Sequence, residues 1–209
     1  MGPATGLSDA AARLVADAST IINLIATGSA RAIVSALPNR MLVVDVVLRE
    51  LETGRARGRE ASERLKELAL DGVLELVELG DDGMPCFEDL VIGPATATLD
   101  DGEAATIAYA VAHDDTALID ERKATRICAE RYPQLRTACT VDVLLHQDVQ
   151  RQLGADLVSD SVFRALRDGR MGVMPHHLDL VVGLIGEERA ALCPSIPRRA
   201  RRSRDGGQI

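Results

Sequence analysis

The stretch LVADASTIINLI, residues 14–25, places one carboxylate, Asp17, between a short apolar run and a segment whose apolar residues recur at helical spacing. The run has the length of a buried strand, and the spacing after it predicts an amphipathic helix. Asp17 alone is explained by capping of that helix, because an N-cap carboxylate accepts a hydrogen bond from a free backbone N–H. A ligand-binding role requires that the same arrangement recur elsewhere in the chain.

The arrangement recurs at TALIDER, residues 116–122, where Asp120 ends another short apolar run. The carboxyl ends of the strands in an open parallel sheet line one crevice, so acids at neighbouring strand ends would share a pocket. Two further acids follow the same logic, Glu50 in VVLREL and Glu103 in DDGEA. Clustered carboxylates repel one another, which favours a bound cation or raised pKa values. Magnesium and manganese, which take oxygen ligands, suit such a group.

Strand-like and helix-like segments alternate along the chain, which predicts an α/β sandwich with a mostly parallel central sheet flanked by helices. Strands are predicted at residues 12–16, 40–45, 72–79, 116–120 and 135–139. Helices are predicted at residues 19–28, 31–37, 46–54, 60–70, 100–113, 121–132 and 140–152. Residues 80–99 contain three glycines and two prolines and are predicted to form a loop.

Length and composition fit one main domain with appendages. Of the 209 residues 46% are hydrophobic but only 2% aromatic, so the core must be aliphatic. We divide the chain into a flexible N-terminus (1–13), a main α/β domain (14–156), a helical C-terminal extension (157–190) and a basic tail (191–209). The tail is expected to be disordered, with binding to phosphates as the alternative.

The charge and hydropathy of the chain exclude several classes of protein. A formal net charge of −8 argues against a surface that is basic throughout. No apolar run approaches the ~20 residues of a membrane span, and the first residues lack the basic and apolar regions of a secretory signal. We therefore expect a cytoplasmic protein that does not contact the membrane.

Residues that often bind transition metals are scattered through the sequence. The four cysteines are too far apart for a C-x-x-C metal site, and we expect them to act as small hydrophobic residues or free thiols: Cys86, Cys128, Cys139 and Cys193. His176 and His177 follow Pro175, and we predict that they are surface residues rather than ligands or catalysts.

Each acid also has a local structural explanation. Asp17 and Asp120 are placed to cap the helices after them, and Asp100 with Glu103 has the spacing of a capping box. Glu50 is explained as an exposed residue of an amphipathic helix. Asp45, at the end of another predicted strand, is assigned to capping of the helix at residues 46–53. Capping gives no reason for four acids to follow successive units of one sheet, so the joint pattern favours a site.

The segments VADASTIINL, VVLRELETG, LDDGEAATIAYA and ALIDERKATRI together resemble the PIN-domain family of metal-dependent nucleases, which includes the VapC-type toxins of bacterial toxin–antitoxin systems. The resemblance covers residues 14 to about 150, and SDSVFRALRDGR resembles the helical extension of a prokaryotic branch of that family. It implies a three-layer sandwich in which four acids form the catalytic and metal-binding set: Asp17, Glu50, Glu103 and Asp120. Two departures concern Glu121, where many members have an Asp nearby, and Asp101, which is an alternative to Glu103.

The resemblance also implies an activity, hydrolysis of RNA by water activated on Mg²⁺ or Mn²⁺. In this scheme Ser19 helps to orient a metal-bound water, and Thr140 is a further polar residue near the site. Arg122 and Lys123 would contact the flanking phosphates of the RNA, unless they are simply solvated helix charges. The expected partners are an RNA substrate, a small antitoxin protein and a second copy of the chain.

Other classes of function remain as alternatives. The strongest is a catalytically silent PIN-like module that binds RNA or protein. A phosphotransfer enzyme with a phosphorylated Asp is less well supported, because DAST, residues 17–20, lacks the second acid of an Asp-x-Asp motif. The chain contains neither the G-x-x-x-x-G-K-[ST] loop of nucleotide-driven enzymes nor the G-x-S-x-G motif of serine hydrolases.

Overall fold

The computed structural model describes residue 7 and residues 11–200 of the chain. Most of the predicted flexible N-terminus and the end of the basic tail, residues 201–209, lie outside the described residues. Leu7 and, within the stretch predicted as a tail, Cys193 and Ile196 are buried.

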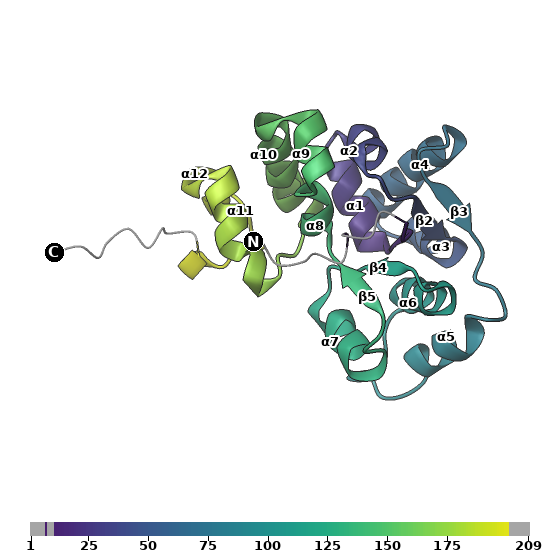
Figure 1. Ribbon diagram of the computed structural model, residues 1–209. Coiled ribbons are helices and arrows are strands. Elements are labelled where there is room, and N and C mark those ends of the chain that lie inside the picture. The colour runs from purple at the N-terminus through teal and green to yellow at the C-terminus, as the bar shows by residue number, and fades with distance from the viewer. Residues whose placement is uncertain (1–6, 8–10, 201–209) are drawn as a thin grey trace.

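The centre of the fold is a sheet of five parallel strands (Figure 1). Its order is β3-β2-β1-β4-β5. The strands are short: β1 (Leu14–Ala16), β2 (Met41–Val44), β3 (Glu75–Val77), β4 (Thr116–Leu118) and β5 (Arg136–Ala138). The chain winds outward in one direction from β1 to β3 and in the other from β4 to β5. The order therefore reverses between β1 and β4, the point at which open α/β sheets bind ligands.

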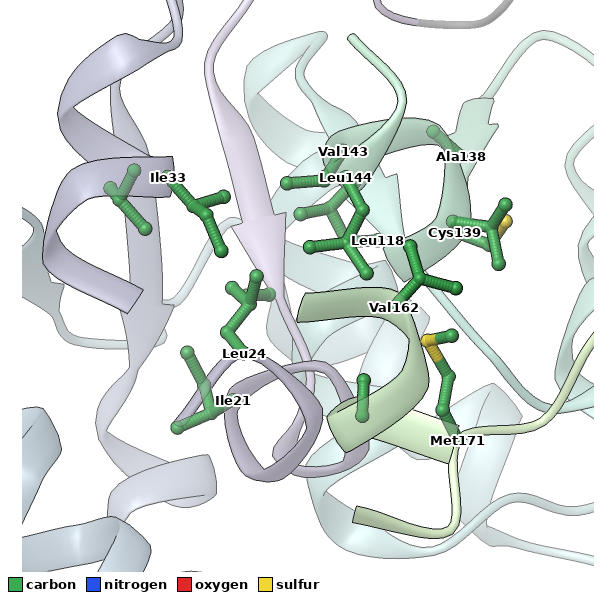
Figure 2. Packing of buried hydrophobic residues seen from close by; sticks show 14 of the residues in the cluster. Ile21, Leu24, Ile33, Leu118, Ala138, Cys139, Val143, Leu144, Val162 and Met171 are labelled. Atoms are coloured by element: carbon green, nitrogen blue, oxygen red, sulfur yellow. The ribbon is translucent and has the colours of Figure 1, made fainter. Parts of the chain in front are cut away.

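Alternate residues of the strands point into two separate hydrophobic cores, as the pleat of a strand requires. Leu14 and Leu118 belong to one core, while Val15 and Ala117 belong to the other. Figure 2 shows part of the first core, where Leu118 lies among side chains of the helices that cover this face. With helices on both faces of the sheet, the predicted α/β sandwich is confirmed.

The helices before β4 follow the predicted order with one addition. They are α1 (Ala18–Ala26), α2 (Ala30–Ala36), α3 (Asp45–Thr53), α4 (Ala56–Leu70), α5 (Met84–Val91) and α6 (Asp101–His113). The addition is α5, which lies inside the predicted loop, so that part of the prediction was wrong. Pro85 stands in the first turn of α5, where its missing N–H and fixed φ are compatible with a helix. Leu90 is fully buried and anchors α5 to the second core.

The helix predicted at residues 140–152 is two helices. After α7 (Arg122–Arg131) come α8 (Thr140–Leu144) and α9 (Gln147–Leu153). They are separated at His146, whose backbone leaves the helical region and whose ring accepts a hydrogen bond from the Asp148 N–H. The prediction missed this break because the apolar spacing continues across it.

The C-terminal segment is helical and shares the first core. It comprises α10 (Ala155–Arg164), a π-helical turn (Ala165–Gly169), a 3-10 turn (Pro175–His177), α11 (Leu178–Ile185), α12 (Glu187–Ala191) and a final 3-10 turn (Arg198–Ala200). Val162 and Val181 are fully buried in the core that also contains Ile21 and Leu24 of α1. Among the described residues, none of the helices has the length and apolar character needed to cross a membrane.

Candidate active site at the ends of the central strands

Asp17 lies directly after β1 and is almost completely buried, with 2% of its surface exposed. One of its carboxylate oxygens accepts a hydrogen bond from the Thr20 N–H at 2.7 Å, so Asp17 is the N-cap of α1. The Ser19 hydroxyl lies 3.0 and 2.9 Å from the two carboxylate oxygens. Asp17 therefore caps the helix, and its carboxylate also interacts electrostatically with Asp120, so capping does not exclude a role in a site.

Asp120 lies two residues beyond the end of β4, the strand that pairs with β1. Its Oδ1 accepts a hydrogen bond from the Thr140 N–H at 2.7 Å, and its Oδ2 accepts one from the Thr140 hydroxyl at 2.6 Å. Glu121, not Asp120, is the N-cap residue of α7. Asp120 is thus held by the start of α8, a segment twenty residues further along the chain.

Asn23 is a site residue that the sequence interpretation missed. Its side-chain amide donates a hydrogen bond to Asp120 Oδ2 at 2.7 Å, and only 3% of its surface is exposed. A signal was present in the sequence, because Thr20, Asn23 and Thr27 recur at helical spacing among the apolar residues of α1. All three are buried, so this polar stripe faces the protein interior.

Glu103 lies in the first turn of α6, with 7% of its surface exposed. The Asp100 side chain caps this helix by accepting a hydrogen bond from the Glu103 N–H at 2.9 Å. The Glu103 side chain itself is left to face other acids. Burial raises the pKa of Glu103 to about 9, and Asp100, a hydrogen bond with Glu121 and the charge of Asp17 add to the shift.

The two strand-end acids, Asp17 and Asp120, have raised pKa values and, among the described residues, no cationic side chain paired with them. Burial and the nearby charge of Asp120 raise the pKa of Asp17 to about 7, against the hydrogen bonds from Thr20 and Ser19. Burial also raises the pKa of Asp120, opposed by its bonds from Thr140 and Asn23. In the described part of the chain, no Arg, Lys or His forms an ion pair with Asp17, Glu50, Glu103 or Asp120.

Glu50 occupies the outer side of the group. It lies on α3 and is exposed, and its carboxylate packs so closely on Gly102 that a side chain at position 102 would collide with Glu50 Oε2. Partial burial of its carboxylate, Asp100 and Asp101 raise the pKa of Glu50. The charge of Asp101 therefore acts on Glu50, whereas that of Asp17 acts on Glu103.

The remaining predicted residues have clear positions. The prediction that Asp45 caps α3 was wrong. Asp45 is the first residue of that helix, and it forms an ion pair with Arg49 at 2.7 Å. Its other carboxylate oxygen accepts a hydrogen bond from the Leu79 N–H at 3.4 Å, which ties α3 to the segment after β3. Arg122 is exposed and Lys123 half-buried in the first turn of α7.

The donor set fits a hard divalent cation. Carboxylate oxygens are the ligands that Mg²⁺ and Mn²⁺ prefer, and buried carboxylates without a cationic side chain are stable only when protonated or when a cation joins them. Asp17 and Asp120 would hold the ion from the strand ends, with Glu103, whose pKa responds to the charge of Asp17, as a third candidate ligand. Among the described residues, no three of the four acids have ligand atoms that all lie within 4.8 Å of one another, and Glu50 interacts with Asp100 and Asp101 instead.

The fold and this site define a class: α/β proteins with acids after the ends of the two strands between which the strand order reverses. A family model described as a PIN domain matches residues 13–187, and the chain belongs to this family. PIN domains are generally nucleases and typically use divalent metals. No curated protein and no solved structure matches the chain.

Proposed function

We propose that the protein is an endoribonuclease that depends on Mg²⁺ or Mn²⁺. The observation that supports this most strongly is the buried group of Asp17, Glu103 and Asp120, which has raised pKa values and no cationic side chain paired with it. A phosphodiester is itself anionic, so carboxylates cannot bind it without an intervening cation. Membership of the PIN family, whose members are generally nucleases, supports the same assignment.

The bound ion would neutralise phosphate oxygens, lower the pKa of a water ligand and stabilise the leaving oxygen during displacement. The residues of the chain supply the orientation. Thr140 and Asn23 fix the Asp120 carboxylate, while Ser19 and the Thr20 N–H fix that of Asp17. This leaves little side-chain freedom to lose when the ion binds. Arg122 and Lys123, at the start of α7 directly after Glu121, are the candidates to bind the flanking phosphates.

We extend the proposal to a role as the toxin of a toxin–antitoxin pair, which a feature beside Glu50 supports. A cleft of about 790 Å³ is lined by Glu50, Asp100, Asp101 and Asp45, with Arg49 as its one cation among the described residues and already paired with Asp45. Such a cleft repels RNA phosphates and suits a basic side chain of a protein partner. A small antitoxin that inserts an Arg or Lys here would block Glu50. A homodimer is also part of this proposal.

The experiment is cleavage of a mixed RNA pool with Mn²⁺, with Mg²⁺ or with EDTA, comparing the wild type with Asp17→Asn. Asp71→Asn is the matched control, because Asp71 is a half-exposed residue paired with Arg31 at the C-terminus of α4. We expect metal-dependent products with 5′-phosphates from the wild type and the control, and none from Asp17→Asn. Induced expression should arrest growth in the same pattern if the protein is a toxin.

A silent binding module is the alternative, and the same proteins distinguish it. Equal cleavage by the wild type and Asp17→Asn would contradict the assignment of the site. Binding of Mn²⁺ without cleavage of any RNA in the pool would contradict the nuclease activity on these substrates. Absence of metal binding would favour the binding module.

A further inference from the structure

A second group of metal-ligand side chains lies near the first but shares no residue with it. Cys139 is the residue before α8, Asp142 is in the first turn of α8, and His177 ends the 3-10 turn Pro175–His177. Asp142 Oδ2 is 3.1 Å from Cys139 Sγ, and Asp142 Oδ1 is 3.1 Å from His177 Nε2. One potential ligand atom from each of the three residues lies within 4.8 Å of the other two. Segments 35 residues apart thus converge on one point.

The prediction that His177 is a surface residue was wrong, whereas His176 is exposed. Only 6% of His177 is exposed, and its Nε2 lies 3.1 Å from Asp142 Oδ1. Burial lowers the pKa of His177, which favours the neutral imidazole that acts as a metal ligand. A buried imidazole nitrogen directed at a buried carboxylate oxygen is also the arrangement of two side chains that bind one metal ion.

Helix capping explains part of this arrangement but not all of it. Asp142 Oδ2 accepts a hydrogen bond from the Cys139 N–H at 2.9 Å, which is ordinary capping-box chemistry. Capping requires neither a thiol at position 139 nor an imidazole directed at the other carboxylate oxygen. In the described chain Asp142 has no Arg or Lys ion-pair partner, its one cationic candidate being His177. The carboxylate, the thiol and the imidazole therefore converge without an Arg or Lys paired to Asp142 among the described residues.

The geometry points to a second metal site in which Cys139, Asp142 and His177 bind a zinc ion through sulfur, oxygen and nitrogen. This donor set favours Zn²⁺ over Mg²⁺, which prefers oxygen alone. Zinc bonds of about 2.0–2.3 Å place neighbouring ligand atoms of a tetrahedron roughly 3.3–3.8 Å apart. The two separations of 3.1 Å involve different oxygens of Asp142, and one ligand atom from each residue lies within 4.8 Å of the other two, so the side chains must move closer together to bind an ion. On binding, the Cys139 thiol releases its proton to water, and a water molecule completes the four ligands.

The position of this site gives it a structural role. It joins the start of α8 to the turn before α11, segments whose only covalent link runs through α9 and α10. Cys139 directly precedes Thr140, which holds Asp120 through two hydrogen bonds. A zinc ion here would therefore fasten the C-terminal segment to the element that orients the carboxylate site. Figure 2 shows Cys139 in the first core, in the same cluster as Met171 and Val162 of that segment.

The test is titration of the full chain with Co²⁺, whose thiolate complexes absorb in the near ultraviolet, followed by competition with Zn²⁺. We expect a sulfur-to-cobalt band and tetrahedral visible bands in the wild type, displaced by one equivalent of Zn²⁺. Cys139→Ser and His177→Gln should each weaken Zn²⁺ binding by about 100-fold, since loss of even an outer-shell partner costs about 10–100-fold. Cys128→Ser, a buried cysteine in the opposite core, is the matched control and should keep the band.

Asp17→Asn tests whether this site is independent of the carboxylate site. The cobalt–thiolate band of this variant should equal that of the wild type, whether or not the protein cleaves RNA. Zinc should also raise the melting temperature of the wild type and of Cys128→Ser, but not of Cys139→Ser. Absence of a thiolate band in the folded wild type would overturn the proposal, as would a band that survives in Cys139→Ser. Circular dichroism of each variant without metal shows whether it is folded.

Discussion

The two ends of β1 and β4 carry opposite electrostatic arrangements. At their N-terminal ends Arg13 precedes β1 and Asp115 precedes β4, and the two form an ion pair with Arg13 Nη2 2.7 Å from Asp115 Oδ2. At their C-terminal ends the corresponding residues are both acids, Asp17 and Asp120. The same two strands therefore carry a neutralised pair at one end and an unneutralised pair at the other.

We infer from this difference that the N-terminal ends contribute to stability, and it supports the proposal that the C-terminal ends bind a cation. The Arg13 guanidinium, whose pKa is raised by Asp115, satisfies the buried carboxylate and fixes the register of the strands. At the other end burial and mutual repulsion raise the pKa of Asp17 instead. Such a cluster is unfavourable in the metal-free protein and is explained by a ligand of positive charge.

The largest expected effect is at the C-terminal end. Asp120→Asn keeps the size of the side chain but removes the charge from the group held by Thr140 and Asn23. We expect a loss of metal-dependent RNA cleavage of at least about 100-fold, because a direct ligand contributes more than the outer-shell partners whose loss costs about 10–100-fold. The measurement is the cleavage rate at saturating Mn²⁺. A rate within threefold of the wild type would mean that the strand-end acids do not bind the catalytic ion.

Asp115→Asn should have the opposite signature. It breaks the ion pair with Arg13, whose side chain is 36% exposed. We therefore expect the free energy of unfolding to fall by about 2 kcal/mol, less than for a fully buried pair. Cleavage per folded molecule should stay within twofold of the wild type. Urea denaturation and the RNA assay on the same preparation provide both numbers. Lost activity with unchanged stability would contradict the division of roles between the two ends.

Thr140→Val tests the support of the carboxylate site rather than a ligand. The substitution removes the hydroxyl that donates to Asp120 at 2.6 Å but leaves the backbone hydrogen bond in place. Affinity for Mn²⁺ should fall roughly 10-fold, with cleavage largely restored at high Mn²⁺. The matched control is Thr116→Val at the start of β4, because the Thr116 hydroxyl is buried without a hydrogen-bond partner in the described structure. Equal effects of the two substitutions would show that the Thr140 hydroxyl does not position Asp120.

Sequence patterns predicted the parts of this protein that local chemistry determines. The parallel sheet followed from short apolar runs alternating with helical spacing, and Asp17 and Asp120 followed from their places after two such runs. Contacts between distant segments were not predictable in this way. Asn23 donates a hydrogen bond to Asp120, and His177 contacts Asp142 from a later turn. The helical spacing of Thr20, Asn23 and Thr27 indicates a buried face but not the partner of Asn23, and His177 has no such signal. The helix α5 differs from the prediction for another reason: three glycines and two prolines in residues 80–99 indicate a loop, but a first helical turn accepts Pro85.

The smallest effect concerns the pH dependence of the metal-free protein. The pKa of Asp17 is about 7 in the folded protein, whereas its ordinary value, which applies to the unfolded chain, is 3.8. As the pH rises, the unfolded chain therefore loses this proton before the folded protein does. Stability present below the ordinary pKa is therefore lost as the pH rises through about 7, and Glu103, with a pKa of about 9, extends the loss to higher pH. In EDTA the wild type should melt at a lower temperature at pH 8 than at pH 5.

Asp17→Asn removes the Asp17 share of this loss while its side-chain oxygen still caps α1. We expect it to be more stable than the wild type at pH 8 by at least about 1 kcal/mol, or roughly 2–4 °C in melting temperature for a chain of this size. At pH 4 the two proteins should differ little. Added Mn²⁺ should reverse the order at pH 8, because only the wild type keeps the full set of carboxylates. If the melting temperatures of the two proteins in EDTA depended equally on pH, burial and Asp120 would not raise the pKa of Asp17. The contrast between the two ends of the strands would then need another explanation.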